Sequence, residues 1–184
     1  KLIPELRRFT PPKNLSQATR SELQQLFKLT NTKRDKKDYL YDESLLDAIR
    51  FHFVEAGAGE DFIKTVCASI SDDVIPLITK LKFFFNRPRP FQLAYYYDMN
   101  LFPDFSFFTN TPSYPSTHTC LTCVTLEVLG NLYPDQYSKT KKIMQSVADS
   151  RLYIGAHYES DNNMSLIVAK AVLGNLDFKM KYHL

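Results

Sequence analysis

The stretch of residues 72–88, DDVIPLITKLKFFFNRP, decides the fold class because it contains a helix start, a helical pattern and a stop. Its two leading aspartates can cap a helix, and the apolar residues behind them predict that the helix runs to about Asn86. Pro88 and Pro90 then end it, since proline lacks the amide hydrogen that a continuing helix needs. The stretch therefore predicts a core helix that leads into a proline-rich loop.

Helical patterns of the same kind account for most of the remaining chain. They are expected over residues 16–29, from the cap at 42–44 to the glycines at 57–59, and over 60–70, 118–131, 135–153 and 160–174. No segment alternates for long with the period of two that a half-buried strand requires. We therefore predict an all-α fold, a single helical bundle of about six or seven helices.

The non-helical stretches suggest how the chain is organised. Residues 1–37 contain an extended proline-bearing arm, a first helix and a basic linker from residue 30, and we expect them to be peripheral. Residues 38–184 are expected to form the bundle domain. Within that domain, residues 87–117 are rich in proline and aromatic residues, and a loop of this length is usually functional or disordered. The tyrosines at 95–97 and the phenylalanines within 105–108 are expected to pack this loop, with lining of a substrate mouth as the alternative.

Composition excludes several classes of protein. The chain has 184 residues, a hydrophobic fraction of 44 % and a net charge of +3, which fit one globular domain. Its short basic clusters indicate solvated faces rather than a nucleic-acid surface. No run approaches the roughly 20 apolar residues of a membrane span, and no signal peptide is recognisable, so we expect a soluble protein. The chain starts with Lys1, which indicates processing or trimming, and leaves compartment, oligomeric state and larger assembly open.

The three cysteines are too few for a disulfide framework. Cys120 and Cys123 lie three residues apart on a predicted helix, a spacing that could serve redox chemistry or metal binding. No cluster of further ligands accompanies them, so we expect both thiols to pack in the core.

The first of three polar clusters is Lys80 with Arg87-Pro88, near the end of the predicted core helix. Seven residues make nearly two helical turns, so both cations lie on one face, about 10 Å apart along the axis. Two converging cations beside apolar side chains can hold an oxyanion. Taken alone, an amphipathic helix whose cations reach into water is the simpler interpretation. Arg89 is expected to be a surface or supporting cation rather than a ligand.

The second cluster, Ser113-Tyr-Pro-Ser-Thr-His118, lies at the start of a predicted helix. The N–H groups at a helix start can bind phosphate, and Ser116 adds a hydroxyl donor. His118 is placed to exchange a proton with a bound group. Taken alone, an ordinary serine cap with a surface histidine explains this cluster equally well.

The third cluster runs from Ser150-Arg151 through His157 to Asp161. Arg151 and His157 are six residues apart and would diverge on a continuous helix, so we expect a break at Gly155. His157 and Asp161 are four residues apart and can face each other. A carboxylate on one imidazole nitrogen leaves the other nitrogen free as a nucleophile, although a surface His–Asp pair has the same spacing.

Together, the order and spacing of the three clusters resemble the signature of the type 2 phosphatidic acid phosphatase and vanadium haloperoxidase superfamily. That signature reads Lys, six residues, Arg-Pro; then Pro-Ser-Gly-His; then Ser-Arg, five residues, His, three residues, Asp. The first and third parts are complete here, and the second has Thr117 in place of Gly. The residues flanking the second part are similar to those of soluble bacterial acid phosphatases.

The resemblance implies a helical-bundle phosphatase in which cations and a helix start hold the phosphoryl group. Lys80, Arg87 and Arg151 would bind phosphoryl oxygens, and Ser116 and the Thr117 N–H would complete the site. No metal or cofactor is implied, because these groups already neutralise the developing charge. Thr117 would be strained if this position needs a positive φ.

The resemblance also implies catalytic roles. His157 would attack phosphorus and form a phosphohistidine, and Asp161 would orient it. His118 would protonate the leaving alcohol and then activate water. The chain would thus be a metal-independent phosphomonoester hydrolase of the acid phosphatase type, acting on a small or surface-presented phosphorylated substrate.

Two other functions fit the same residues. A vanadium haloperoxidase would hold vanadate, a phosphate mimic, as its cofactor, whereas in a phosphatase vanadate would act as an inhibitor. Haloperoxidases of the superfamily are much longer, which favours the phosphatase. A non-catalytic domain of a larger assembly is the third interpretation, against which the six retained charged or titratable residues argue.

Overall fold

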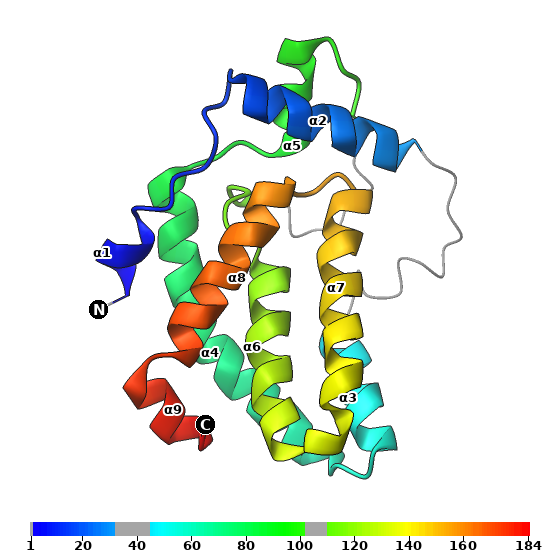
Figure 1. Cartoon of the computed structure of the whole chain (residues 1–184), viewed down its shortest axis with the longest axis vertical. Coiled ribbons are helices and arrows are strands. Elements are labelled where there is room, and N and C mark those ends of the chain that lie inside the picture. The colour runs from blue at the N-terminus through cyan, green and yellow to red at the C-terminus, as the bar shows by residue number, and fades with distance from the viewer. Residues whose placement is uncertain (1, 32–44, 102–109) are drawn as a thin grey trace.

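The structure, a computed structural model, describes residues 2–31, 45–101 and 110–184 (Figure 1). The described residues form helices and no strand, which confirms the predicted all-α bundle. In chain order the elements are α1 (Ile3–Leu6), α2 (Gln17–Thr30), α3 (Leu45–Glu55), α4 (Glu60–Phe85), α5 (Pro90–Ala94), η2 (Tyr95–Tyr97), α6 (Thr117–Leu132), η4 (Pro134–Gln136), α7 (Tyr137–Tyr153), α8 (Glu159–Leu173) and α9 (Leu176–Tyr182).

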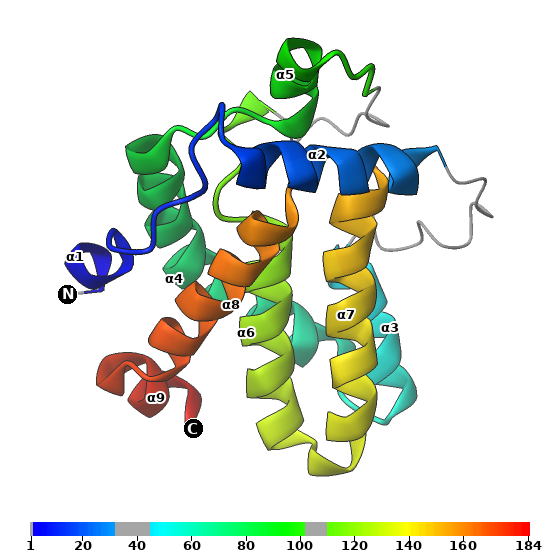
Figure 2. The same ribbon diagram turned by 45° about the horizontal axis from the view of Figure 1, so that its top comes forward.

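Helix α6 is the centre of the bundle. It packs against α4, α7 and α8, and Figures 1 and 2 show it between these three helices. Its buried residues lie on several sides of the helix, among them Cys120, Val124, Leu126 and Leu129. A helix that is apolar on most sides is expected in a core, so the start of α6, with the second cluster, is held by packing along its whole length.

Helix α4 is longer than the sequence patterns predicted. Separate helices were expected over 60–70 and 72–86, but a single helix runs from Glu60 to Phe85 and passes through Pro76. The reason is a continuous apolar stripe at spacings of three and four residues, which packing keeps helical across the proline. Its buried members are Ile63, Cys67, Ile70, Val74, Ile78 and Leu81. The helix ends at Phe85, where Asn86 adopts a left-handed conformation with φ 47°.

Helix α2 lies across the ends of α7 and α8 that are nearest the third cluster (Figures 1 and 2). The helix predicted over 16–29 is present, and Ser16 caps it by accepting a hydrogen bond from the Thr19 N–H. Leu23 and Leu26 are buried in a small core with α5 and Tyr158. The arm before α2 also contains the short helix α1. The proposed boundary at residue 37 and the cap at 42–44 lie outside the described residues, so the division into an arm and a bundle domain stays a prediction.

The proline-rich stretch after α4 is partly helical, with α5 and η2 in its first half. Tyr97 is half-buried and donates to Asn14 O at 2.6 Å. Tyr95 and Tyr96 are exposed, which corrects the expectation that all three tyrosines pack the loop. The phenylalanines within 105–108 lie outside the described residues.

The cysteines are free and pack as expected. Cys120 is fully buried in the main core, and Cys123 lies half-buried one turn further along α6. Burial raises the pKa of the Cys67 and Cys123 thiols to about 11, so these thiols stay protonated and unreactive near neutral pH. Within the described ranges, no helix combines the length and apolar character needed to cross a membrane.

Candidate active site

The centre of the site is a buried contact between His157 and Asp161. His157 Nδ1 lies 3.0 Å from Asp161 Oδ2, and the side chains are 3 % and 0 % exposed. The break predicted at Gly155 is present, with φ 69° at that glycine, and α8 starts only after His157. The pair therefore spans a turn and the first turn of α8, not one continuous helical face.

The other nitrogen of His157 faces Arg89. Arg89 Nη1 lies 2.9 Å from His157 Nε2, and a guanidinium has donors only. Nε2 must accept, so Nδ1 carries the ring proton and donates it to Asp161. Burial, together with Arg89, Lys82, His118 and Arg151, holds the pKa of His157 well below its usual range. The imidazole is thus neutral, with its one lone pair directed at a cation.

Arg87 and Arg89 bracket the His157–Asp161 pair. They flank Pro88 in the stretch between α4 and α5, and residues two apart in a non-helical stretch can face the same side. Arg89 approaches the imidazole, and Arg87 Nη1 donates to Asp161 Oδ1 at 2.7 Å. The Asp161 carboxylate therefore accepts from both His157 and Arg87.

Arg87 does not occupy the phosphate-binding position that the sequence assigned to it. Its Nη2 donates to Glu22 Oε2 at 2.8 Å, and its guanidinium carbon lies 3.8 Å from the centre of the Tyr158 ring. Burial alone would lower the pKa of Arg87, but Asp161 and Glu22 raise it above its ordinary value. A guanidinium engaged with two carboxylates is a structural cation, which corrects the expected role.

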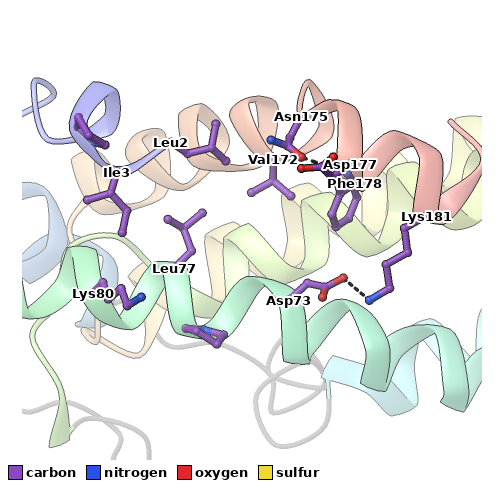
Figure 3. Close-up of a pocket in the computed structure, with 12 residues that line it drawn as sticks. Leu2, Ile3, Asp73, Leu77, Lys80, Val172, Asn175, Asp177, Phe178 and Lys181 are labelled. Carbon is purple, nitrogen blue, oxygen red and sulfur yellow. Dashed lines mark hydrogen bonds and ion pairs between the residues drawn. The ribbon is translucent and has the colours of Figure 1, made fainter.

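Lys80 is also absent from the site. It is exposed on α4 and, with Ile3, Leu77 and Phe178, lines an apolar groove between α1, α4 and α9 (Figure 3). Helical spacing explains the difference, because position 80 falls on the face of Leu77 while position 82 follows buried Ile78 by four residues. The lysine beside the other site residues is Lys82.

Lys82 is 3 % exposed and donates to Pro112 O at 2.6 Å and to Ser113 O at 3.4 Å. Burial is the main reason that its pKa falls to about 7, with a contribution from Arg89 and an opposing one from Asp161. Burial likewise lowers the pKa of Arg89 to about 10. Both groups lie in surroundings that disfavour positive charge and would gain from a bound anion.

Arg151 completes the group of buried cations. It is 1 % exposed, and its Nε donates to Ser150 Oγ at 3.1 Å. Its carbonyl accepts the N–H groups of Ala156 and His157, which fixes the turn that carries the imidazole. Arg151 lowers the pKa of both His118 and His157, so its charge acts on both rings.

The second cluster forms the start of α6 as predicted. Ser116 caps the helix, Thr117 is its first residue and His118 its second. Among the described residues, the non-glycine positions with positive φ are Asn86, Asp98 and His183. Thr117 is therefore free of the backbone strain considered from the sequence, and its N–H lies among the unsatisfied donors of a helix start.

His118 shares the electrostatic surroundings of His157. Burial comes first in lowering its pKa to about 3, followed by Arg151, Lys82 and Arg89. In the free protein His118 is therefore neutral. Negative charge bound beside the three cations would act in the opposite direction and favour its protonated form.

The sequence interpretation missed Lys82 and Glu22, and it gave Arg89 only a surface or supporting role. Lys82 and Arg89-Pro90 repeat the spacing of Lys80 and Arg87-Pro88, two residues further on. The pattern of buried apolar residues along α4 could have distinguished the two copies, because it shows which lysine faces the core. Glu22 is 65 residues from Arg87 in the chain, and no sequence pattern marks it.

Buried cations, a helix start and a neutral histidine held by a carboxylate are features that can bind an anion beside a nucleophilic nitrogen. A family model described as PAP2 superfamily matches residues 65–176, more than half of the chain, and the chain belongs to this superfamily. Membership suggests phosphoester hydrolase or haloperoxidase-type activity. A search of curated proteins found no match.

Proposed function

We propose that this chain hydrolyses phosphomonoesters through a phosphohistidine at His157. The observation that carries the proposal is the pair of contacts on His157, with Asp161 on Nδ1 and the Arg89 cation on Nε2. This arrangement fixes one tautomer and aims its lone pair at the place where cations would hold an anion. The family supports phosphoester chemistry in general.

Substrate binding would use the three buried cations. Phosphoryl oxygens would accept from Lys82, Arg89 and Arg151, and from N–H groups at the start of α6. The lowered pKa values of Lys82 and Arg89 mean that a phosphate dianion relieves an existing electrostatic cost. No metal is needed for this neutralisation, which supports the metal-independent mechanism.

In the first step, the Nε2 lone pair of His157 forms the N–P bond while the P–O bond to the leaving group breaks. The phosphoryl oxygen takes over the Arg89 donor, which frees the lone pair. His157 keeps its Nδ1 proton, and Asp161, which accepts a hydrogen bond from it, stabilises the positive charge that develops on the ring. His118, protonated once the dianion is bound, gives its proton to the departing alkoxide.

In the second step, His118 takes a proton from water as the water oxygen attacks phosphorus. The N–P bond breaks, its electron pair returns to Nε2, and inorganic phosphate leaves. One histidine thus acts as the nucleophile in both steps, and the other acts first as acid and then as base.

The test is a quenched-flow experiment with p-nitrophenyl phosphate and detection of phosphohistidine in the denatured protein. Wild type should form the phosphohistidine enzyme, and His157→Ala should form none. His118→Ala should still be labelled, because p-nitrophenolate leaves without a proton, but hydrolysis of the intermediate should stall.

The matched control is His183→Ala, which removes an exposed histidine at the end of α9 and should behave as wild type. Labelling of the His157→Ala protein would contradict the proposal, as would turnover by wild type without any phosphohistidine. Halide oxidation by hydrogen peroxide with added vanadate, in place of phosphatase turnover, would assign the haloperoxidase activity instead.

A further inference from the structure

Helix α2 lies outside the residues that the family model matches, yet it contributes a carboxylate to the site. Glu22 Oε2 accepts from Arg87 Nη2 at 2.8 Å, and Oε1 accepts the Ser160 N–H at 2.8 Å. The Glu22 side chain is only 13 % exposed. Each oxygen has its own partner, so Glu22 joins Arg87 to the first turn of α8.

Arg87 connects this carboxylate to the one that holds His157. Its two terminal nitrogens lie 2.8 Å from Glu22 and 2.7 Å from Asp161. Four groups therefore form a linear series: Glu22, Arg87, Asp161 and His157. Each contact in the series is buried or nearly so, and electrostatic coupling is strong where water is excluded.

The charge of Arg87 is shared between two carboxylates in this series. If Glu22 were neutral, Arg87 would act on Asp161 alone, and Asp161 would interact less strongly with the imidazole. The three cations around His157 already oppose positive charge on the ring. Asp161 is the carboxylate that contacts the ring, so the negative charge it can offer determines how well a positive charge on the ring is stabilised.

We propose that Glu22 is a positioning residue for the phosphorylation step, which balances Arg87 so that Asp161 stays available to His157. This inference rests on the proposed function. When Nε2 bonds to phosphorus, the ring holds both a proton and a phosphoryl group and becomes positive. Glu22 acts through Arg87 and Asp161 on that charge and does not touch the substrate.

The proposal predicts a specific kinetic defect. Glu22→Gln keeps the shape of the side chain and an oxygen for the Ser160 N–H but removes the charge. Phosphoenzyme formation in a single turnover should slow about tenfold. The substrate concentration for half-saturation should stay the same, because the three binding cations are untouched.

A purely structural role for Glu22 would give a different result. It would lower the fraction of active enzyme, measured as the amplitude of phosphoenzyme, and leave the rate of the active fraction unchanged. Glu159→Gln is the matched control, because Glu159 is an exposed acid at the first position of α8. It removes the same charge one residue from Ser160 and should leave the rate at the wild-type value.

A second measurement does not depend on activity. The Nδ1 proton of His157 reports its hydrogen bond to Asp161 in the free protein by proton NMR. Its resonance should move upfield in Glu22→Gln and stay in place in Glu159→Gln. Glu22→Asp, which keeps the charge with a shorter reach, should show a phosphorylation rate closer to wild type than Glu22→Gln.

The outcomes separate the two proposals. If wild type forms no phosphohistidine, the proposed function fails, and the proton resonance alone decides the role of Glu22. If wild type is phosphorylated and Glu22→Gln matches it in both rate and resonance, the role of Glu22 is overturned. A slower rate in Glu22→Asp than in Glu22→Gln would also overturn it. If Glu22→Gln does not fold, Glu22→Ala, which also removes the charge, takes its place: an unmoved resonance overturns the inference, and an upfield shift supports it.

Discussion

Two overlapping copies of one motif run through residues 80–90, and the fold gives them opposite surroundings. The copy formed by Lys82 and Arg89 lies at His157, where the pKa of each cation is lowered to about 7 and about 10. In the other copy, Lys80 is exposed at a groove, and Arg87 lies between two carboxylates that raise its pKa. The same residue types at the same spacing therefore serve different purposes.

The difference shows how to recognise a binding cation among buried cations. A charge already satisfied by carboxylates holds the fold together, whereas a charge kept in a costly environment is ready for a ligand. The second kind reduces stability in the free protein and regains it when an anion binds. Stability and activity measurements should therefore rank the two copies in opposite orders.

The largest expected effect is on stability, in Arg87→Met. Removal of this guanidinium leaves buried Asp161 without its ion-pair partner, which typically costs about 3–5 kcal/mol of the free energy of unfolding. Arg89 donates to Thr111 O and Ala156 O, each at 2.9 Å. Arg89→Met should cost less than about 1 kcal/mol, because the loss of these hydrogen bonds is offset by removal of a disfavoured charge. Urea unfolding at pH 6 measures both, and equal losses would abolish the distinction.

The next effect is on turnover and reverses the order. Arg89→Ala and Lys82→Ala should each lower kcat/KM by about 10²–10³-fold, the typical loss for one donor to a transition-state oxyanion. Arg89→Lys should recover little, because an ammonium lacks the planar fork of the guanidinium. The assay is hydrolysis of p-nitrophenyl phosphate, and a fully active Lys82→Ala protein would return the phosphate-binding role to Lys80.

A smaller effect is the pH dependence that Lys82 gives to stability. Its pKa is about 7 in the folded protein and about 10.4 when unfolded, so between these values the unfolded chain binds more protons. Stability therefore rises with pH from about 7 to about 10, and below pH 7 the full cost of the buried charge is present. Urea unfolding at about pH 7, 8 and 9 should show this rise in the free energy of unfolding of wild type, and Lys82→Met should reduce the rise. If the free energy of unfolding rises with pH as steeply in Lys82→Met as in wild type, burial of the Lys82 ammonium does not destabilise the fold.

The smallest effect is expected at Lys80, the lysine of the copy that lies away from His157. Lys80→Met should change kcat/KM by less than about twofold and the free energy of unfolding by less than about 0.5 kcal/mol, as for other exposed positions. Steady-state kinetics and urea unfolding suffice to measure it. A loss of activity comparable to that of Lys82→Ala would show that both copies of the motif bind substrate.

What the sequence could predict depended on how local the information was. The His157–Asp161 contact and the turn at Gly155 follow from spacing and from one glycine with φ 69°. The start of α6 followed equally from the Ser116 cap. These features need only a few neighbouring residues to be specified.

The errors came from packing over longer distances. The choice between Lys80 and Lys82 depends on which face of α4 is buried, and the sequence was divided at residue 71 where the structure has one helix. Glu22 reaches Ser160 across 138 residues of chain. Its contact exists only because Leu23 and Leu26 dock α2 onto the bundle, which no local pattern specifies.

The hydrogen bond from Arg89 to His157 Nε2 engages, in the resting protein, the lone pair of the nucleophile that we propose. Any electrophile, whether a phosphate ester or an acylating agent, needs the lone pair that this donor occupies. Only a ligand that offers Arg89 a better acceptor uncovers it, and a phosphoryl oxygen does so in the same movement that brings phosphorus to the nitrogen. In the proposed mechanism, substrate binding and release of the lone pair are thus one event, and the arginine that binds the phosphoryl group also shields the histidine from other electrophiles.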